Sequence, residues 1–176
     1  AQRQSMVLLK NKNNILPLEE GSKIYIDGID EEVAEEYARV VSSREEADFV
    51  VLKIQAPYEV RNDLLLERLF RQGSLEFVEV EKRRILNKIS NKPSIVIITL
   101  DRPAVIPKIS KEAEGLIADF ENENDAILDI VFGRAKPQGK LPVELPSSME
   151  AVKNQLPDVP YDSKDPLYPY GYGLEY

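Results

Sequence analysis

The sequence contains no histidine, no cysteine and no tryptophan among its 176 residues. Without histidine, the chain lacks the commonest general base and the commonest metal ligand, and Ser-His and Cys-His catalytic arrangements are excluded. Without cysteine, disulfide bonds and thiolate metal sites are excluded as well. Any chemistry carried out by these residues must therefore use carboxylates, lysine or tyrosine.

Basic residues are fewer than acidic ones, 23 against 31, which gives a net charge of −8. Eleven acidic side chains and only three basic ones fall between Glu19 and Asp48. An acidic surface of this kind repels phosphate backbones, so nucleic acid is not an expected partner. No hydrophobic run approaches the length of a membrane span, and no signal peptide opens the chain. We therefore expect a soluble domain with no membrane partner, and secreted and bacterial cytoplasmic locations both stay open.

Strand-like and helix-like hydrophobic patterns alternate along a chain that is long enough to bury one sizeable core. Continuous apolar runs such as SIVIITL (94–100) fit strands that are covered on both faces. This order predicts an α/β fold, a three-layer α/β/α sandwich with a mostly parallel sheet of about five to six strands and an extended C-terminal arm. We expect strands at 23–27, 48–54, 94–100 and 114–120, and helices at 1–9, 31–41, 75–90 and 124–132.

Three parts are expected along this single domain. Residues 1–18 are interpreted as an entry helix and linker from a missing upstream domain, because an apolar helical pattern begins there without a capping residue. Residues 19–146 form the α/β sandwich core, and residues 147–176 wrap over its surface as an arm. The tyrosines crowded into 161–176 are interpreted as packing this arm onto the domain.

The sequence APYEVRND (56–63) is the most site-like stretch, because it follows an expected strand. In open parallel sheets, binding sites gather at the carboxyl ends of the strands. The stretch combines the ring of Tyr58 with the carboxylate of Glu59, the guanidinium of Arg61 and the amide of Asn62. Aromatic rings suit the C–H faces of sugars, and planar polar side chains suit their hydroxyl groups. A solvated loop leading into a helix N-cap explains the same residues.

Two further groups of carboxylates follow expected strands. Asp27 and Asp101 are similar to a phospho-acceptor pocket, which needs an adjacent acidic pair and a lysine after a later strand, and neither is evident. The alternating acidic residues of 119–125 offer oxygen ligands of the kind that Ca²⁺ prefers, without the glycine and terminal glutamate of an EF-hand. A solvated helix N-terminus explains this stretch, so neither a metal nor a cofactor is predicted.

Three phrases occur in a characteristic order over nearly all of the chain. SMVLLKNKNNILPL (5–18) opens it, GRAKPQGKLPVELP (133–146) follows the last expected helix, and YGYGLEY (170–176) closes it. Together they resemble the C-terminal α/β domain of glycoside hydrolase family 3, the β-glucosidase and β-xylosidase family. Arg134 and Lys140 lie in the second phrase, which we interpret as structural.

The resemblance implies a β-glucosidase-like retaining glycosidase, in which two carboxylates act across the glycosidic bond. The nucleophile would lie on an upstream (β/α)8 barrel domain, the implied partner, and the implied substrate is a β-linked glycoside. The loop after the second expected strand corresponds to the family's acid/base loop, and Glu59 is our candidate in it, although PYEVRND differs from the family's G-E-x-x-D-R-like phrase. Glu67 is the rival candidate, and the alternative interpretation of Glu67 is an exposed helical glutamate. Tyr58, Arg61 and Asn62 would bind the substrate.

Because the barrel is missing from these 176 residues, the chain alone is expected to be inactive as a glycoside hydrolase. The alternative hypothesis belongs to another class, a non-catalytic carbohydrate-binding or interaction module of the same fold. Measurable sugar affinity of the isolated chain, with no barrel upstream, would favour this alternative.

Overall fold

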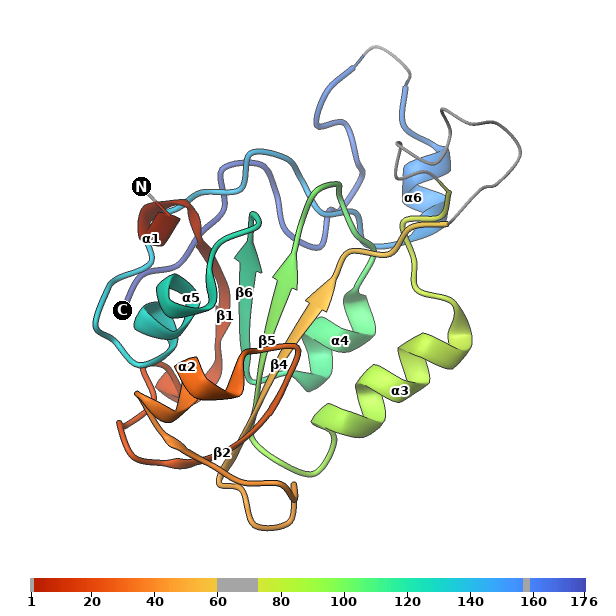
Figure 1. The fold of residues 1–176 in the computed structure, drawn as a ribbon. Helices are drawn as coiled ribbons and strands as arrows, with labels where there is room; N and C mark the ends of the chain where they lie inside the picture. Colours follow the sequence, from red (N-terminus) through yellow and green to blue (C-terminus); the bar gives the residue numbers. More distant parts are fainter. Residues whose placement is uncertain (1, 60–72, 157–158) are drawn as a thin grey trace, which may run out of the picture.

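The computed structural model describes residues 2–59, 73–156 and 159–176, and within them a six-stranded sheet forms the centre (Figure 1). The order of its strands is β1-β6-β5-β4-β2-β3. All neighbouring pairs are parallel except β1 with β6, so β1 is an antiparallel edge strand. The predicted mostly parallel sheet is confirmed. The strands are β1 (Val7–Asn11), β2 (Lys23–Asp27), β3 (Arg39–Val40), β4 (Phe49–Gln55), β5 (Ser94–Thr99) and β6 (Gly115–Asp119).

Helices cover both faces of this sheet, which confirms the predicted three-layer α/β/α sandwich. The cluster on one face includes residues of α2 and α5, and the cluster on the other includes residues of α3 and α4. None of the helices in the described part of the chain is long and apolar enough to cross a membrane. The helices are α1 (Gln2–Ser5), α2 (Glu31–Glu35), α3 (Glu79–Ile89), α4 (Pro107–Glu112), α5 (Asn124–Val131), α6 (Met149–Lys153) and the 3-10 turn η1 (Lys12–Asn14).

The ends of α2 and α5 follow the capping signals in the sequence. The side chain of Asp30 accepts a hydrogen bond from the backbone N–H of Val33 at 3.3 Å, as an N-cap residue does. Gly133, just past α5, has φ +75, a left-handed conformation in which a Cβ would be strained. Aspartate before the first helical residue and glycine after the last turn are thus the sequence signals that bound these two helices.

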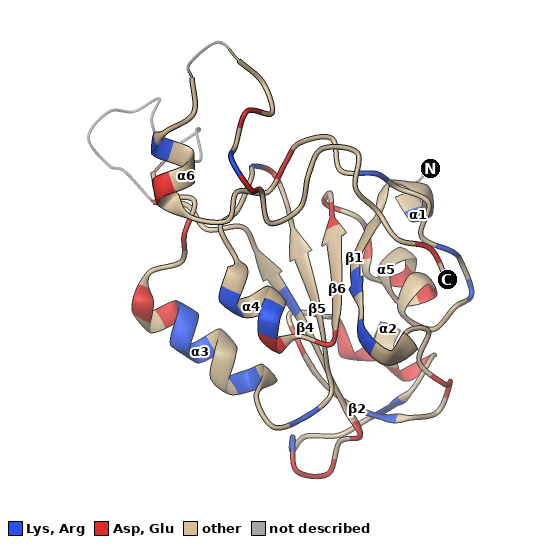
Figure 2. Cartoon of the chain, turned by 180° about the vertical axis from the view of Figure 1, so that it is seen from behind, with Lys and Arg blue, Asp and Glu red and all other residues tan. Residues whose placement is uncertain are grey.

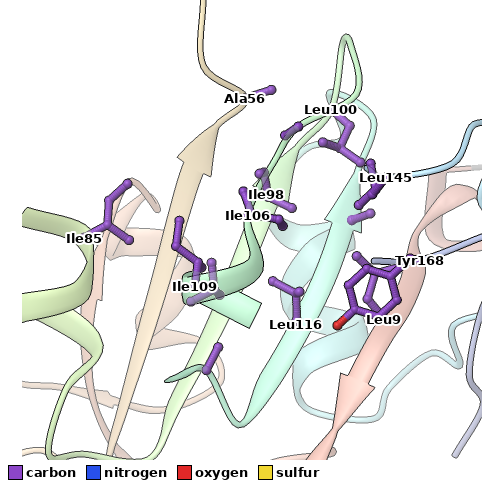
Figure 3. Packing of buried hydrophobic residues seen from close by; sticks show 14 of the residues in the cluster. Leu9, Ala56, Ile85, Ile98, Leu100, Ile106, Ile109, Leu116, Leu145 and Tyr168 are labelled. Atoms are coloured by element: carbon purple, nitrogen blue, oxygen red, sulfur yellow. The ribbon is translucent and has the colours of Figure 1, made fainter. Parts of the chain in front are cut away.

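Strand β5 is buried at every position and divides the core into two clusters. Side chains alternate along a strand, so Val96 and Ile98 face the α3 and α4 side, whereas Ile95 and Ile97 face α5. Figure 3 shows Ile98 among its neighbours on the first side, with Leu116 of β6 close by. This double burial explains why the four central residues of β5, 95–98, are all apolar.

The C-terminal segment completes the first of these two clusters. Leu145 and Tyr168 are buried there, and the backbone N–H of Leu145 donates to the Tyr168 carbonyl at 2.8 Å (Figure 3). The Tyr168 and Ser110 hydroxyls share a 2.7 Å hydrogen bond, and burial raises the pKa of Tyr168. Further along, the Leu174 N–H donates to the Leu8 carbonyl of β1 at 2.8 Å. The expected packing role is thus confirmed for Tyr168.

A polar cluster around Tyr37 ties the chain before β1 to α5. The Tyr37 hydroxyl donates to Asp129 Oδ1 at 2.8 Å, and Arg3 forms an ion pair with the same carboxylate. Burial first, and then the hydrogen bond to Asp129, raise the pKa of Tyr37 to about 12. The guanidinium of Arg134 lies 3.9 Å from the centre of the Tyr37 ring and pairs with Glu20, so the structural interpretation of Arg134 is confirmed.

The predicted helix over residues 1–9 is wrong. Helix α1 ends at Ser5, and residues 7–11 form β1, with Val7 paired to Ala118 of β6. Val7, Leu8 and Leu9 are buried on both sides of the sheet edge, and a short continuous apolar run has no periodicity that separates strand from helix. Part of the expected entry segment therefore belongs to the sheet, and the division of the chain at residues 18 and 146 stays a prediction.

Three smaller expectations also differ from the structure. The helix expected at 31–41 ends at Glu35, and β3 follows it to pair with β2. The helix expected at 75–90 begins only at Glu79, so Val78 is the N-cap residue of α3 and is 66% exposed. Helix α4 was not predicted, because its six residues are too few to show a helical period.

The charged residues also divide between elements. Figure 2 shows blue lysine and arginine positions repeating along α3, and red acidic positions along α2. On α3, Lys82 pairs with Glu76 at 2.5 Å, and this partner raises the pKa of Lys82. The excess of acidic residues between Glu19 and Asp48 therefore lies over the α2 side, where four glutamates stand between positions 31 and 36.

The same substitution at a buried and an exposed valine tests this core. Val96→Ala removes two methyl groups from a fully buried position in β5, so we expect a loss of about 2–3 kcal/mol in the free energy of unfolding. Val80→Ala, on α3 at 81% exposure, is the matched control and should change it by less than about 0.5 kcal/mol. Urea unfolding followed by circular dichroism measures both, and equal losses would contradict the assigned core.

Candidate functional site

The carboxyl ends of the parallel strands meet at one edge of the sheet. The last residues of β2, β4, β5 and β6 are Asp27, Gln55, Thr99 and Asp119, all polar. Figure 1 shows the arrowheads of β4, β5 and β6 pointing toward the end of the molecule that carries α6. Since sites in open α/β sheets form outside the carboxyl ends of the strands, we take this edge as the candidate site.

At the centre of the edge lies a buried carboxylate, Asp119, whose oxygens are all engaged. Its Oδ1 accepts from the Asn122 N–H at 3.1 Å and from the Asn122 amide at 2.7 Å. Its Oδ2 accepts from the Thr99 hydroxyl at 2.9 Å and lies 3.9 Å from the Lys53 ammonium. A carboxylate with this many partners fixes the turn between β6 and α5, and we assign it a supporting role.

The acidic stretch 119–125 does not form a cation site. Across residues 2–59, 73–156 and 159–176, no group of three or more acidic side chains is arranged to hold a metal ion. Asp125 lies in the first turn of α5 and pairs with Arg3 at 3.3 Å. The carboxylates of this stretch are thus directed to separate partners.

The two aspartates that are similar to a phospho-acceptor pair lie apart. Asp27 forms an ion pair with Lys88 of α3, whereas Asp101 accepts a hydrogen bond from the Gln55 amide at 3.1 Å. Strand β4 lies between β2 and β5, so the two carboxylates stand at the ends of strands that are not neighbours. Beside Asp27, a polar cleft of about 200 Å³ separates α3 from the ends of β2 and β4.

The stretch singled out in the sequence begins at this same edge. Tyr58 and Glu59 follow β4 and are exposed, and Glu59 Oε1 accepts from the backbone N–H of Ser74 at 3.1 Å. The Arg102 guanidinium, just past β5, donates to the Gly73 carbonyl at 2.8 Å. The other predicted site residues, Arg61, Asn62 and Glu67, lie outside the described residues. The structure therefore places Tyr58 and Glu59 at the edge, and the contacts predicted for Arg61, Asn62 and Glu67 stay predictions.

A cavity of about 260 Å³ opens beside these contacts. Leu75 and Pro103, the sequence neighbours of Ser74 and Arg102, form part of its lining. Leu156 and Tyr161 of the C-terminal segment line it from the other side, and both are exposed. The carboxyl edge thus combines a hollow and apolar side chains next to Glu59.

Sequence reasoning missed a carboxylate that lines this cavity, Glu144. It is 7% exposed, and its Oε1 accepts from the Gln155 amide at 2.9 Å and from the Ser163 N–H at 3.1 Å. Glu144 lies in LPVELP (141–146), the end of the phrase that we interpreted as structural. The available signal was a single glutamate between two apolar residues and two prolines.

Two tyrosines of the C-terminal segment depart from the expected packing role. Tyr161 and Tyr170 are 50% and 56% exposed, and their rings stack with centroids 4.3 Å apart. Tyr161 also lines the cavity that holds Glu144. An exposed stacked pair next to a carboxylate is a surface that suits a sugar ring or a partner domain.

Comparison with known proteins identifies the class to which this fold and edge belong. Residues 25–176 match the family model described as glycosyl hydrolase family 3 C-terminal domain. The chain belongs to this family, and the resemblance seen in its three phrases is confirmed.

Several relatives are similar over nearly the whole chain. Beta-glucosidase C of Emericella nidulans is 48% identical over 181 residues, which covers 100% of this chain and 29% of the relative. The periplasmic beta-glucosidase/beta-xylosidase of Dickeya chrysanthemi is 37% identical, with 98% of this chain and 27% of the relative covered. The chain therefore spans less than a third of the length of these proteins.

Solved structures show the same fold at low sequence identity. The beta-glucosidase of Listeria innocua in complex with glucose superposes with a TM-score of 0.73 at 19% identity, over 97% of this chain and 32% of that one. Beta-glucosidase D2-BGL of Chaetomella raphigera gives a TM-score of 0.77 at 18% identity, over 99% and 35%. At this identity the likeness establishes the α/β architecture alone.

The role assigned to Asp119 is testable by stability. Asp119→Ala leaves the buried donors of Thr99 and Asn122 unpaired, so we expect a loss of about 3 kcal/mol in the free energy of unfolding. Glu123→Ala is the control, because Glu123 is exposed and makes no side-chain capping bond to α5. Chemical denaturation measures both variants. A stable Asp119→Ala variant would show that this network does not hold the edge together.

Proposed function

We propose that this chain is the C-terminal part of a retaining family 3 β-glycosidase of the β-glucosidase type. Similarity over the whole chain to relatives named as β-glucosidases is the observation that carries this proposal. In that role the domain supplies one wall of the sugar site, and its substrate is a β-linked glycoside. The exposed, hollowed carboxyl edge described above is the wall that we assign.

The nucleophile belongs to another part of the complete protein. A retaining glycosidase uses two carboxylates about 5 Å apart, one as nucleophile and one as acid and then base. We assign the nucleophile to a (β/α)8 barrel outside these 176 residues, which would be the partner of this domain. Exposed apolar side chains at the edge, Tyr58, Leu156 and Tyr161 among them, offer this partner a surface to cover.

Glu59 is the carboxylate that we assign as acid/base. It lies exposed at the carboxyl edge, and one of its oxygens is fixed by the Ser74 N–H. In the first step its proton goes to the glycosidic oxygen as the bond to the sugar breaks, and in the second it takes a proton from the attacking water. Tyr58, Arg61 and Asn62 are proposed to bind the sugar, and Glu67 stays the rival acid/base.

A second candidate function is supported by the stacked tyrosines. Tyr161 and Tyr170 expose a stacked aromatic pair beside the cavity that Glu144 lines, as a carbohydrate-binding surface does. A module that only binds sugar would need no partner carboxylate. Its isolated chain would therefore bind a β-linked disaccharide by itself.

The assignment of Glu59 is tested by substitution in the complete enzyme. Glu59→Ala should lower kcat/KM for an alkyl β-glucoside by about 10²- to 10⁴-fold, because the leaving oxygen loses its proton donor. Azide should restore turnover of an activated aryl glucoside and yield a glucosyl azide. Glu81→Ala, an exposed glutamate of α3, is the matched control and should keep wild-type kinetics. Unchanged kinetics of Glu59→Ala, with loss and azide rescue in Glu67→Ala, would transfer the role to Glu67.

The division of labour predicts that the isolated 176-residue chain does not hydrolyse glycosides. Without the nucleophile only one of the two carboxylates is present, so an aryl β-glucoside should be cleaved no faster than in buffer. Release of the chromogenic phenol measures this, with the complete enzyme as positive control. Efficient turnover by the purified chain would contradict the proposal, whereas binding of cellobiose without turnover would favour the second candidate.

A further inference from the structure

One peptide group connects a cation and a carboxylate at the candidate site. The carbonyl of Gly73 accepts from Arg102 Nη2 at 2.8 Å, and the N–H of Ser74 donates to Glu59 Oε1 at 3.1 Å. The Gly73 carbonyl and the Ser74 N–H belong to the same peptide bond and point to opposite sides of it. Arg102 and Glu59 therefore hold the same planar unit from its two ends.

Gly73 has no side chain where this arrangement leaves no room for one. Its φ is +89, in the left-handed region that side chains disfavour. A Cβ on Gly73 would also lie 2.4 Å from Cδ and 2.6 Å from Cβ of Glu59, closer than such atoms approach. Glycine is thus required twice, once by the backbone and once by the position of the Glu59 carboxyl group.

The peptide is also anchored to the segment that follows β5. The N–H of Val105 donates to the Leu75 carbonyl at 2.8 Å, and Glu76 forms a parallel bridge with Val105. These bonds lie within three residues of both the Gly73–Ser74 peptide and Arg102. The position of the peptide that binds the Glu59 carboxyl group is therefore fixed by the segment that directly follows the fully buried strand β5.

We propose that Arg102 and Gly73 are positioning residues for Glu59, acting through the Gly73–Ser74 peptide. The inference rests on the proposed function, in which Glu59 is the acid/base. Arg102 holds the peptide so that its N–H fixes Oε1, and Gly73 leaves the space that the carboxyl group occupies. Because Oε1 accepts the hydrogen bond of the Ser74 N–H, we assign the transferred proton to the other oxygen, Oε2.

Arg102 also acts electrostatically on the Glu59 carboxyl group, because both are hydrogen-bonded to the same peptide group. A guanidinium that donates to a carbonyl polarises the peptide, and hydrogen bonds in a chain strengthen one another. The Ser74 N–H then stabilises the carboxylate that remains after Glu59 has given up its proton. Arg102 thereby assists proton donation without touching the substrate.

Leaving-group dependence in the complete enzyme separates this role from a general structural one. An alkyl β-glucoside needs a proton on its leaving oxygen, whereas a dinitrophenyl β-glucoside does not. Arg102→Ala should therefore lower kcat/KM about 10- to 100-fold for the alkyl substrate and less than about twofold for the dinitrophenyl one. Arg102→Lys, which keeps a charged donor, should recover most of the loss.

Arg83→Ala is the matched control, because Arg83 of α3 is exposed and forms an ion pair with Glu79 at 3.1 Å. It should leave both substrates at wild-type rates. Equal loss on both substrates, or none, in a folded Arg102→Ala enzyme would overturn the inference. If Arg102→Ala does not fold, Arg102→Gln decides: a loss confined to the alkyl substrate supports the role, and equal rates for both overturn it.

The two proposals fail in different ways. If Glu59→Ala keeps its activity on the alkyl substrate, the acid/base assignment is wrong whatever Arg102 does. If Glu59→Ala shows loss and azide rescue while Arg102→Ala keeps the wild-type ratio of the two substrates, only the positioning role is wrong. Measuring both variants on the same two substrates separates these results.

Discussion

The complete burial of β5 is the constraint on which the rest of the domain depends. A strand covered on both faces is apolar along its centre, as residues 95–98 of β5 are, and β5 separates the cluster under α3 and α4 from the cluster under α5. Because its neighbours β4 and β6 run parallel to it, their polar ends arrive at one edge. Thr99 and Arg102 at the end of β5 then contact Asp119 and Gly73, so the position of the edge follows from the core.

The sequence was sufficient for the layers and insufficient for the sheet edges. Long apolar runs and capped helices, such as β5 and the Asp30-capped α2, have local signals that agree with their packing. Strands β1 and β3 lack such signals: β1 becomes a strand because β6 offers it a partner, and β3 is two residues long. Pairing with a distant strand is a tertiary event that no local period records.

The position of the candidate site could be predicted from the sequence, whereas its hydrogen bonds could not. Parallel strands imply a common carboxyl edge, so the stretch that begins at Ala56 could be placed there from its order in the chain. The bond from Ser74 to Glu59 joins residues fifteen positions apart through a backbone group, which has no residue type to read. Glu144 was equally hidden, because burial of a carboxylate depends on Gln155 and Ser163 rather than on its neighbours in sequence.

The position of the edge strand β1 in the chain also affects when the sheet can be completed during synthesis. Val7 pairs with Ala118, more than a hundred residues later in the chain, so β1 is the first strand of the sheet to be synthesised and waits longest for a neighbouring strand. At ribosomal speeds of about 5–20 residues per second, its apolar residues wait roughly 5–20 s for β6 to emerge. During this interval the run MVLL is an unpaired, exposed apolar segment of the nascent chain, which is prone to aggregation. Among the strands of the sheet, β1 therefore exposes its apolar residues for the longest time during synthesis, and it is the strand on which a chaperone would act.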